Sequence, residues 1–397
     1  MKFYIIGIDD SQSPCFSENI QDILSNEVVF SGGKRHYQIV QSFLPHSYQW
    51  IDVTIPLESV FQEYKQHSSI VVFASGDPLF FGLANTIKRE FPNADIALYP
   101  YFNSLQLLAH RLVLPYHDMH IVSLTGRPWD KFDEALIRGY KKIGVLTDRK
   151  IHTPANIVKH MIEYGYDNYK VTVGELLGND KREKVTTFEC LNDVVNRDFS
   201  YPNNLILEQT THRVKPFGIP NEDFYLLNSR TRMITKMPIR LLSLSLLDLH
   251  QKHTFWDVGF CTGSVSIEAK LQFPHLKVVA FEKREEGRAL IVRNAKKIGT
   301  PGIEYHIGDF TQKDLSNLTA PDAVFIGGHG GKMMEIIAQI QPLLKPQGVI
   351  VFNSVSLESQ QLFRDAIHKY KLTLMESISI QIDNFNTIEV MKAIKTH

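Results

Sequence analysis

Short apolar runs alternate with amphipathic stretches along the first half of the chain. A short continuous apolar run is typical of a buried strand, whereas apolar positions that recur every three or four residues indicate a helix. The runs predict strands over 3–8, 51–55, 70–74, 96–99, 120–124, 143–146, 170–176 and 205–207. The amphipathic stretches predict helices over 57–65, 79–90, 105–112, 131–138 and 155–164. This alternation indicates an α/β fold with largely parallel sheets.

A polar stretch at 208–218 interrupts the pattern, and a second alternation follows it. Strands are expected over 254–258, 277–281, 304–307, 323–326 and 349–353, with helices over 234–247, 264–272, 285–298, 332–344 and 360–368. Two β-rich runs, 372–382 and 387–393, predict a closing antiparallel hairpin. We therefore expect a first domain at 1–207 with lobes 1–114 and 115–207, a linker at 208–218 and a second domain at 219–397.

The composition fits several globular domains and excludes some classes of protein. Single cores stop growing near ~250–300 residues, and the chain has 397, of which 43% are hydrophobic and 22% charged. Lys+Arg and Asp+Glu both total 43, so the charge balance gives no support to nucleic-acid binding. The three cysteines are too few and too scattered for a disulfide framework or a metal cage, so we expect no metal and a cytoplasmic location. No run approaches ~18 apolar residues, so no membrane span is expected.

The most informative motif of the second half joins the strand at 254–258 to the helix at 264–272. It reads Asp257-Val258-Gly259-Phe260-Cys261-Thr262-Gly263. Glycines at 259 and 263 let a ligand approach the backbone and tolerate positive φ, whereas Cys261 suits a backbone that avoids positive φ. Thr262 or Ser264 can cap the helix. The dinucleotide fingerprint Gly-x-Gly-x-x-Gly fits this spacing poorly, which disfavours a nicotinamide-dependent oxidoreductase.

This turn resembles the S-adenosylmethionine (AdoMet) turn of class I methyltransferases, Asp/Glu-x-Gly-x-Gly-x-Gly, with Cys261 in place of the middle glycine. The resemblance implies a Rossmann-like domain. Glu282, which closes the next strand, is expected to accept both ribose hydroxyls, and Gly308-Asp309 follows the third strand, where the resembling fold contacts adenine. The AdoMet-binding residues implied for this half are Thr235, Asp257, Gly259, Phe260, Cys261, Thr262, Gly263, Glu282, Gly308 and Asp309.

A second group of motifs lies in the first half. Ser75-Gly76-Asp77-Pro78-Leu79-Phe80 follows a buried strand, and Asn103-Ser104 precedes a helix. A Gly-Asp-Pro sequence alone is compatible with an ordinary turn. The order of these motifs resembles the tetrapyrrole methylase superfamily, in which AdoMet lies between two α/β lobes. The resemblance implies a second AdoMet site at Ser75, Gly76, Asp77, Phe80, Asn103 and Ser104, although Gly7-Ile8-Asp9-Asp10-Ser11 departs from the usual Gly-x-Gly-Pro-Gly turn.

The second half is similar to decarboxylating corrinoid methyltransferases in Met233-Ile234-Thr235-Lys236 and Phe325-Ile326-Gly327-Gly328. Together the two resemblances imply methylation of a corrinoid at ring carbons 5 and 15 in cobalamin biosynthesis, with loss of the carboxyl group of the acetate on ring carbon 12. They imply one AdoMet site per domain and precorrin-6B or its cobalt form as substrate. We also expect a homo-oligomer.

A polycarboxylate substrate suits arginine and lysine partners. The candidates are Lys34, Arg35 and Arg127 in the first half, and Arg230, Arg232, Lys236 and Arg240 in the second. Arg127, between Gly126 and Pro128, is preferred, and His329 is a further candidate because glycines flank it. Methyl transfer needs alignment and electrostatics more than a proton carrier, and we assign no catalytic residue.

Two alternatives stay open. One is a class I RNA or protein methyltransferase whose first half is a non-catalytic binding module, although the chain lacks the aromatic and basic stripe typical of RNA binding. The other is a scaffold whose first half has lost AdoMet binding, which the unusual Asp9-Asp10 turn would explain.

Overall fold

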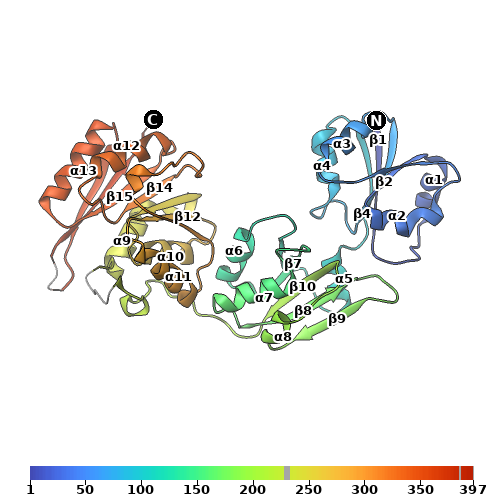
Figure 1. Cartoon of the computed structure of the whole chain (residues 1–397), viewed down its shortest axis with the longest axis horizontal. Helices are drawn as coiled ribbons and strands as arrows, with labels where there is room; N and C mark the ends of the chain where they lie inside the picture. Colours follow the sequence, from blue (N-terminus) through green and yellow to red (C-terminus); the bar gives the residue numbers. More distant parts are fainter. Residues whose placement is uncertain (228–232, 384–385, 397) are drawn as a thin grey trace. The chain divides into compact units, whose positions relative to one another are not determined.

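The computed structural model describes residues 1–227, 233–383 and 386–396 (Figure 1). Contacts within the chain divide it into two units, each of which is described by itself. One unit contains Met1–Arg127, Tyr140–Lys159 and Tyr169–Thr210, and the other contains Pro128–Gly139, His160–Asn168 and Thr211–His397. No helix in the described ranges is long and apolar enough to cross a membrane.

The first sheet has five parallel strands in the order β3-β2-β4-β1-β5. Its strands are β1 (Lys2–Ile8), β2 (Val29–Gly32), β3 (Gln49–Asp52), β4 (Ser69–Ser75) and β5 (Asp95–Tyr99). Its helices are α1 (Glu18–Asn26), α2 (Lys34–Val40), η1 (Gln41–Phe43), α3 (Glu58–Tyr64) and α4 (Leu83–Glu90). Successive strand residues point to opposite faces, so Phe3 and Ile5 pack with α3 and α4, whereas Ile6 and Ile8 pack with α1 and α2.

The second sheet departs from the expected parallel pattern. Its order is β6-β7-β10-β8-β9, and only β6 and β7 pair in parallel. The connection between β8 and β9, residues 176–183, is shorter than the dozen or so residues that a parallel crossover needs, so the two strands pair antiparallel. The strands are β6 (His120–Ser123), β7 (Lys142–Leu146), β8 (Tyr169–Glu175), β9 (Lys184–Phe188) and β10 (Asn203–Gln209). The helices between residues 104 and 195 are α5 (Ser104–Arg111), α6 (Asp130–Arg138), α7 (Pro154–Glu163) and α8 (Asn192–Val195).

The third sheet has the order β13-β12-β11-β14-β15-β17-β16. Its strands are β11 (Thr254–Val258), β12 (Lys277–Glu282), β13 (Ile303–Ile307), β14 (Ala323–Ile326), β15 (Val349–Ser354), β16 (Thr373–Ile380) and β17 (Ile388–Ile394). Its helical segments are η2 (Asn221–Asp223), α9 (Met237–Leu247), η4 (Leu249–Gln251), α10 (Ser264–Gln272), α11 (Glu286–Ile298), η5 (Phe310–Gln312), α12 (Met333–Leu343) and α13 (Leu357–Lys369). The first five strands pair in parallel, and β16 and β17 form the expected antiparallel hairpin.

The two faces of the third sheet pack on different helices (Figure 1). Trp256 and Val258 pack with α12 and α13, whereas Phe255 packs with α9 and α10. Because side chains alternate along a strand, Asp257 lies on the same face as Phe255, toward α10. The strand order reverses between β11 and β14, and such a reversal is where α/β sheets bind ligands.

A buried ion pair holds the chain that enters this sheet. Arg240 of α9 and Glu268 of α10 have side chains that are 0% exposed, with Arg240 Nε and Glu268 Oε2 3.2 Å apart. The Glu268 carboxylate also accepts hydrogen bonds from Gly218 N at 3.1 Å and Ile219 N at 2.8 Å, and Arg240 Nη1 donates to the Thr235 carbonyl at 2.9 Å. The prediction that Arg240 binds substrate carboxylates is therefore wrong, because a carboxylate of this chain already occupies it.

We expect Glu268→Ala to lower the free energy of unfolding by about 3–5 kcal/mol, because it leaves the Arg240 charge buried and unpaired. The matched control is Glu285→Ala, which removes an exposed partner of Arg288 and should cost no more than about 1 kcal/mol. Denaturant unfolding followed by circular dichroism measures both. Equal costs for the two variants would contradict an anchoring role for the buried pair.

Candidate functional site

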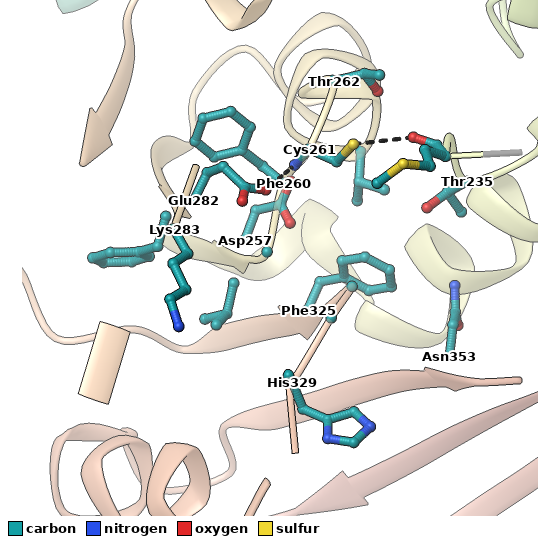
Figure 2. Close-up of a pocket in the computed structure, with 18 of the residues that line it drawn as sticks. Thr235, Asp257, Phe260, Cys261, Thr262, Glu282, Lys283, Phe325, His329 and Asn353 are labelled. Atoms are coloured by element: carbon teal, nitrogen blue, oxygen red, sulfur yellow. Dashed lines mark hydrogen bonds between the residues drawn. The ribbon is translucent and has the colours of Figure 1, made fainter. Parts of the chain in front are cut away.

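A cavity of about 720 Å³ opens at the carboxyl edge of the third sheet. Loops that follow β11, β12, β13 and β14 form much of its wall, because the carboxyl ends of parallel strands meet at one edge (Figure 2). The structure brings together most of the residues predicted from the second half. Those that line the cavity are Thr235, Lys236, Asp257, Gly259, Phe260, Cys261, Thr262, Glu282, Gly308, Asp309 and His329.

The turn between β11 and α10 requires glycine at both predicted positions. Gly259 has φ +84° and Gly263 has φ +76°, in the left-handed region that favours glycine. A Cβ atom on Gly259 would lie 2.8 Å from Gly328 N, and one on Gly263 would lie 2.9 Å from Ile291 Cγ1. The two glycines therefore permit the close packing of the turn against the loop after β14 and against α11.

Cys261 differs from its expected conformation, because its φ is +53°. A left-handed backbone costs a residue with a side chain roughly 1–2 kcal/mol. Two hydrogen bonds hold it there: its N–H donates to Glu282 Oε2 at 2.8 Å, and its thiol Sγ donates to the Met233 carbonyl at 3.1 Å (Figure 2). The expectation of a backbone without positive φ was wrong because these contacts come from segments distant in sequence.

The N-terminus of α10 is capped by a residue other than those expected. Gly263 occupies the cap position, and neither Thr262 nor Ser264 provides a side-chain cap. The carboxyl group of Asp257 takes this role, since its Oδ2 accepts hydrogen bonds from Ser266 N at 3.1 Å and Ser266 Oγ at 2.6 Å. The distant carboxyl group reaches the first turn because Asp257 points from β11 toward α10.

Asp257 is completely buried, and burial raises the pKa of its carboxyl group to about 7. Its second oxygen, Oδ1, has no hydrogen-bond partner in the described part of the chain. Thr262 Oγ1, at the same turn, is likewise buried and lacks a partner among the described residues. Both residues line the cavity, so the site fits a ligand that carries hydrogen-bond donors.

Glu282 lies at the end of β12, with its carboxylate surrounded by donors. Besides Cys261 N, it accepts hydrogen bonds from Arg284 N at 3.0 Å, Arg284 Nε at 2.9 Å and Arg284 Nη2 at 3.0 Å. Burial opposes ionisation here, but the hydrogen bonds from Arg284 outweigh it and lower the pKa of the Glu282 carboxyl group. The group therefore carries a charge at neutral pH.

Asp309 follows β13 and is also paired inside the chain. Lys332 Nζ donates to its Oδ2 at 2.7 Å, while Thr311 N and Thr311 Oγ1 donate to its Oδ1 at 3.1 Å and 2.8 Å. The hydrogen bond from Lys332 and those from Thr311 hold the pKa of this carboxyl group well below its usual range. Two acids with low pKa values thus lie near the buried Asp257.

His329 lies in the loop after β14, and its ring contacts Phe352 edge-on with centroids 5.8 Å apart. Its Nδ1 accepts a hydrogen bond from Gly331 N at 3.1 Å, and burial lowers the pKa of the ring. The neutral ring then carries its proton on Nε2, which makes Nε2 a donor. The predicted Arg230 and Arg232 lie outside the described residues.

Asn353 and Arg284 are among the cavity residues that sequence reasoning missed. Asn353 lies near the end of strand β15. Its Oδ1 accepts a hydrogen bond from Ser243 Oγ at 3.1 Å, whereas its Nδ2 has no partner within the described chain. Figure 2 shows its amide on the same side of the cavity as Thr235. The signal for Asn353 was available, because it ends an apolar run at the edge where the other strand-end residues gather. Arg284 follows β12 at the same distance as Asp309 follows β13, so its position offered a signal as well.

Close packing of loops defines the predicted site of the first half. A Cβ atom on Gly7 would lie 1.9 Å from the Gly76 carbonyl oxygen. Gly76 itself has φ +63°, and a Cβ atom on it would lie 2.8 Å from the Asn103 Cα. The end of β1 and the loops after β4 and β5 therefore meet at the carboxyl edge of the first sheet, and glycine is required where they touch.

The polar side chains of these loops accept hydrogen bonds from α2 and from the backbone. Ser75 Oγ accepts a hydrogen bond from Arg35 Nη2 at 2.6 Å, and Asp77 Oδ1 accepts one from Leu79 N at 2.9 Å. Asn103 caps α5, with its Oδ1 accepting from the third backbone N–H of the helix at 3.0 Å. Ser104 is the exposed first residue of α5. Arg35 thus lies against the predicted AdoMet loop.

Arg127 also reaches this loop. Its Nη1 donates to Ser123 Oγ at 2.6 Å, and its guanidinium carbon lies 5.0 Å from the centroid of the Phe81 ring. Phe81 packs edge-on against Phe80 of the same loop, with centroids 5.2 Å apart. Lys34, in contrast, is exposed at the start of α2. The structure therefore brings Arg35 and Arg127 to the predicted site of the first half.

Known proteins resemble both halves in the same order. The model of tetrapyrrole (corrin/porphyrin) methylases matches residues 17–190, and the model of the precorrin methyltransferase domain matches residues 228–396. A precorrin-6Y C(5,15)-methyltransferase (decarboxylating) from Sinorhizobium sp is 30% identical over 368 residues, which cover 91% of this chain and 86% of the relative. The chain belongs to the precorrin-6Y C(5,15)-methyltransferase (decarboxylating) family.

Two further relatives agree with this family. A precorrin-6Y C(5,15)-methyltransferase (decarboxylating) from Mycobacterium tuberculosis is 26% identical over 90% of this chain and 88% of the relative. A cobalt-precorrin-6B C(15)-methyltransferase (decarboxylating) from Salmonella typhimurium is 35% identical over 138 residues, 35% of this chain and 70% of the relative. As a member of the precorrin-6Y C(5,15)-methyltransferase family, the chain is an AdoMet-dependent methyltransferase of corrinoids, and the resemblances read from its motifs are confirmed.

The buried position of Asp257 predicts a pH dependence of stability. The pKa of its carboxyl group is about 7 in the folded chain, against 3.8 for the unperturbed group. The folded state therefore holds the proton more tightly, and its stability is lost as the pH rises from about 4 through about 7. Relative to Asp257→Asn, the wild type should lose ~1.4 kcal/mol of unfolding free energy per pH unit in this range.

Urea unfolding of the wild type and of Asp257→Asn, between about pH 4.5 and pH 8, measures this difference. The asparagine variant is the control, since it keeps the size of the side chain but cannot ionise. A difference between the two proteins that stays constant with pH would contradict the raised pKa.

Proposed function

We propose that this chain methylates a precorrin at ring carbons 5 and 15 and removes the carboxyl group of the acetate on ring carbon 12, in cobalamin biosynthesis. The observation that carries the proposal is the 720 Å³ cavity that places the unpartnered Asp257 and Thr262 oxygens beside the glycine turn. The family of the chain supports the reaction. Precorrin-6B or its cobalt form is the proposed substrate, and the chain is proposed to act as a homo-oligomer in the cytoplasm.

In the second half, residues at the ends of β11, β12 and β13 would hold AdoMet. Asp257 Oδ1 would accept a hydrogen bond from the ligand, and the turn at Gly259 would let the ligand approach the backbone closely. Glu282 would accept hydrogen bonds from the ribose hydroxyls, and Asp309 would contact adenine. When bound, AdoMet supplies an electrophilic methyl group on a sulfonium sulfur. Asp257 and Glu282 thus bind and orient one reactant, which brings the two reactants into alignment and lowers the barrier without a proton carrier.

The other side of the cavity is proposed to hold the corrinoid. Lys236 brings a cation for a substrate carboxylate, and His329 brings a neutral N–H donor. In the reaction, a ring carbon would use an electron pair to form the bond to the methyl group. The bond between that methyl group and sulfur would break, its electron pair would stay on the sulfur, and S-adenosylhomocysteine would leave. The C–C bond to the acetate carboxyl group then breaks, its electron pair enters the conjugated ring, and CO₂ leaves. The substrate is its own electron sink, so the chain needs only to position it.

In the first half, we propose a second AdoMet site at the loop of Ser75, Gly76, Asp77 and Phe80 together with Asn103 and Ser104, which makes one site per domain. Its support is the close packing of the Gly76 loop on Asn103. Arg35 and Arg127 lie against the same loop and would pair with substrate carboxylates. The alternative of an RNA or protein methyltransferase has no comparable support, because both matched families are tetrapyrrole or precorrin methylases.

The test is incubation of the full chain with AdoMet and precorrin-6B, or with its cobalt form, followed by mass spectrometry. The product should gain two methyl groups and lose one CO₂. A methylated product that always keeps the acetate carboxyl group would overturn the decarboxylation.

Variants of the two turns should separate the two methylations. Asp77→Ala should remove only the methyl group at ring carbon 5, whereas Gly263→Val should remove the methyl group at ring carbon 15 and the loss of CO₂, because a side chain there meets Ile291. A misplaced reactant slows transfer by about 100-fold or more. Asp22→Ala, on the exposed face of α1, is the control and should leave both reactions unchanged. If either turn variant, folded by circular dichroism, loses both reactions, the division of labour is wrong.

A further inference from the structure

The hydrogen-bonding capacity of the Glu282 carboxylate is already filled by the chain itself. Two ionised oxygens offer about four acceptor positions. Cys261 N takes one at 2.8 Å, and Arg284 takes the other three through N at 3.0 Å, Nε at 2.9 Å and Nη2 at 3.0 Å. No position remains for the two ribose hydroxyls that the proposed function assigns to this carboxylate.

The four donors differ in how easily they can leave. Cys261 N and Arg284 N belong to the backbone of the glycine turn and of the segment that follows β12, so they stay with Glu282. The guanidinium group is at the end of a flexible side chain that is 39% exposed, whereas the Glu282 side chain is 4% exposed. The guanidinium is therefore the group that a ligand can replace.

The guanidinium also matches the shape of the group that would replace it. Nε and Nη2 form a planar fork that donates one hydrogen bond to each carboxylate oxygen. The two hydroxyls of a ribose also present a pair of neighbouring donors. In the absence of ligand, the Arg284 guanidinium thus fills the acceptor positions of the Glu282 carboxylate and holds its orientation. It binds the same two oxygens that a vicinal diol would use.

We propose that the Arg284 guanidinium occupies the ribose subsite of Glu282, and that AdoMet binds by displacing it. This inference rests on the proposed function, because it takes Glu282 as the partner of the ribose. Arg284 then weakens AdoMet binding, since every binding event must first break the fork. The free site stays ordered and charged, and only a ligand with a vicinal diol restores the hydrogen bonds that are lost.

Isothermal titration of the full chain with S-adenosylhomocysteine tests this proposal without any turnover. The component of the isotherm that Glu282→Gln weakens identifies the site of the second half. Arg284→Ala should tighten binding at this site by about two- to tenfold, the range expected when a partly exposed bidentate pair no longer competes. Arg288→Ala, which removes an arginine that pairs with the exposed Glu285, is the matched control and should leave binding unchanged.

A second ligand shows whether Arg284 competes with the ribose hydroxyls for Glu282 or weakens ligand binding only through its charge. With 2′,3′-dideoxy-S-adenosylhomocysteine, which lacks both hydroxyls, Arg284→Ala should bring no gain, because this ligand does not use the two oxygens. Arg284→Gln, which keeps a polar side chain but loses the fork, should behave as Arg284→Ala does. Equal gains for both ligands would overturn the proposal.

Two results distinguish failure of this inference from failure of the proposed function. If Glu282→Gln weakens S-adenosylhomocysteine binding but Arg284→Ala leaves it unchanged or weakens it, Arg284 is not a competitor and the inference alone is overturned. If Glu282→Gln changes neither component of the isotherm, Glu282 does not bind the ribose, and that part of the proposed function is overturned together with the inference.

Discussion

The hydrogen bonds that Ser266 donates to the buried carboxyl group of Asp257 are the contact on which the second-half site depends. They join the end of β11 to the first turn of α10 across the glycine turn. With strand and helix held in this way, the turn passes so close to the loop after β14 that Gly259 has no room for a Cβ atom. The same turn lines the cavity, and Asp257 Oδ1 beside it has no partner among the described residues.

Three acids at neighbouring strand ends have different electrostatic surroundings. Among the described residues, no cation pairs with Asp257, so burial dominates and raises the pKa of its carboxyl group to about 7. Glu282 and Asp309 each have a cationic side chain within hydrogen-bond distance, Arg284 and Lys332, which keeps them ionised. The edge of one sheet therefore offers a carboxyl group near its point of titration beside two carboxylates that stay charged. Such separation of pKa values marks functional sites, and it arises here from the partners rather than from the residue type.

The glycine spacing and the strand ends could be predicted because they follow from local periodicity. Asp257, Glu282 and Asp309 each follow an apolar run, and parallel strands bring their carboxyl ends to one edge. The cap of α10 could not be predicted, since Asp257 and Ser266 are joined only once the strand and helix pack. Arg240 could not be distinguished from a surface cation either, because its partner Glu268 lies on another helix. The antiparallel pairings of β10 with β7 and β8, and of β8 with β9, could not be predicted either, because the pairing direction is set by how the strands meet in the sheet.

The sequence by itself determined most of the strands and helices, the two methyltransferase motifs and the family to which the chain belongs, but it missed β2, β9, α1 and α2. Periodicity reports which face of a segment is buried, and turn residues report where the backbone needs glycine, so these features are local. Only the tertiary structure decided which donors bind each buried carboxylate. It also decided which cationic side chain is buried in the core and which one lines a cavity. The physical reason is that a hydrogen-bond partner is chosen by proximity in space, and residues such as Arg240 and Glu268, or Cys261 and Glu282, meet only after the sheet has formed.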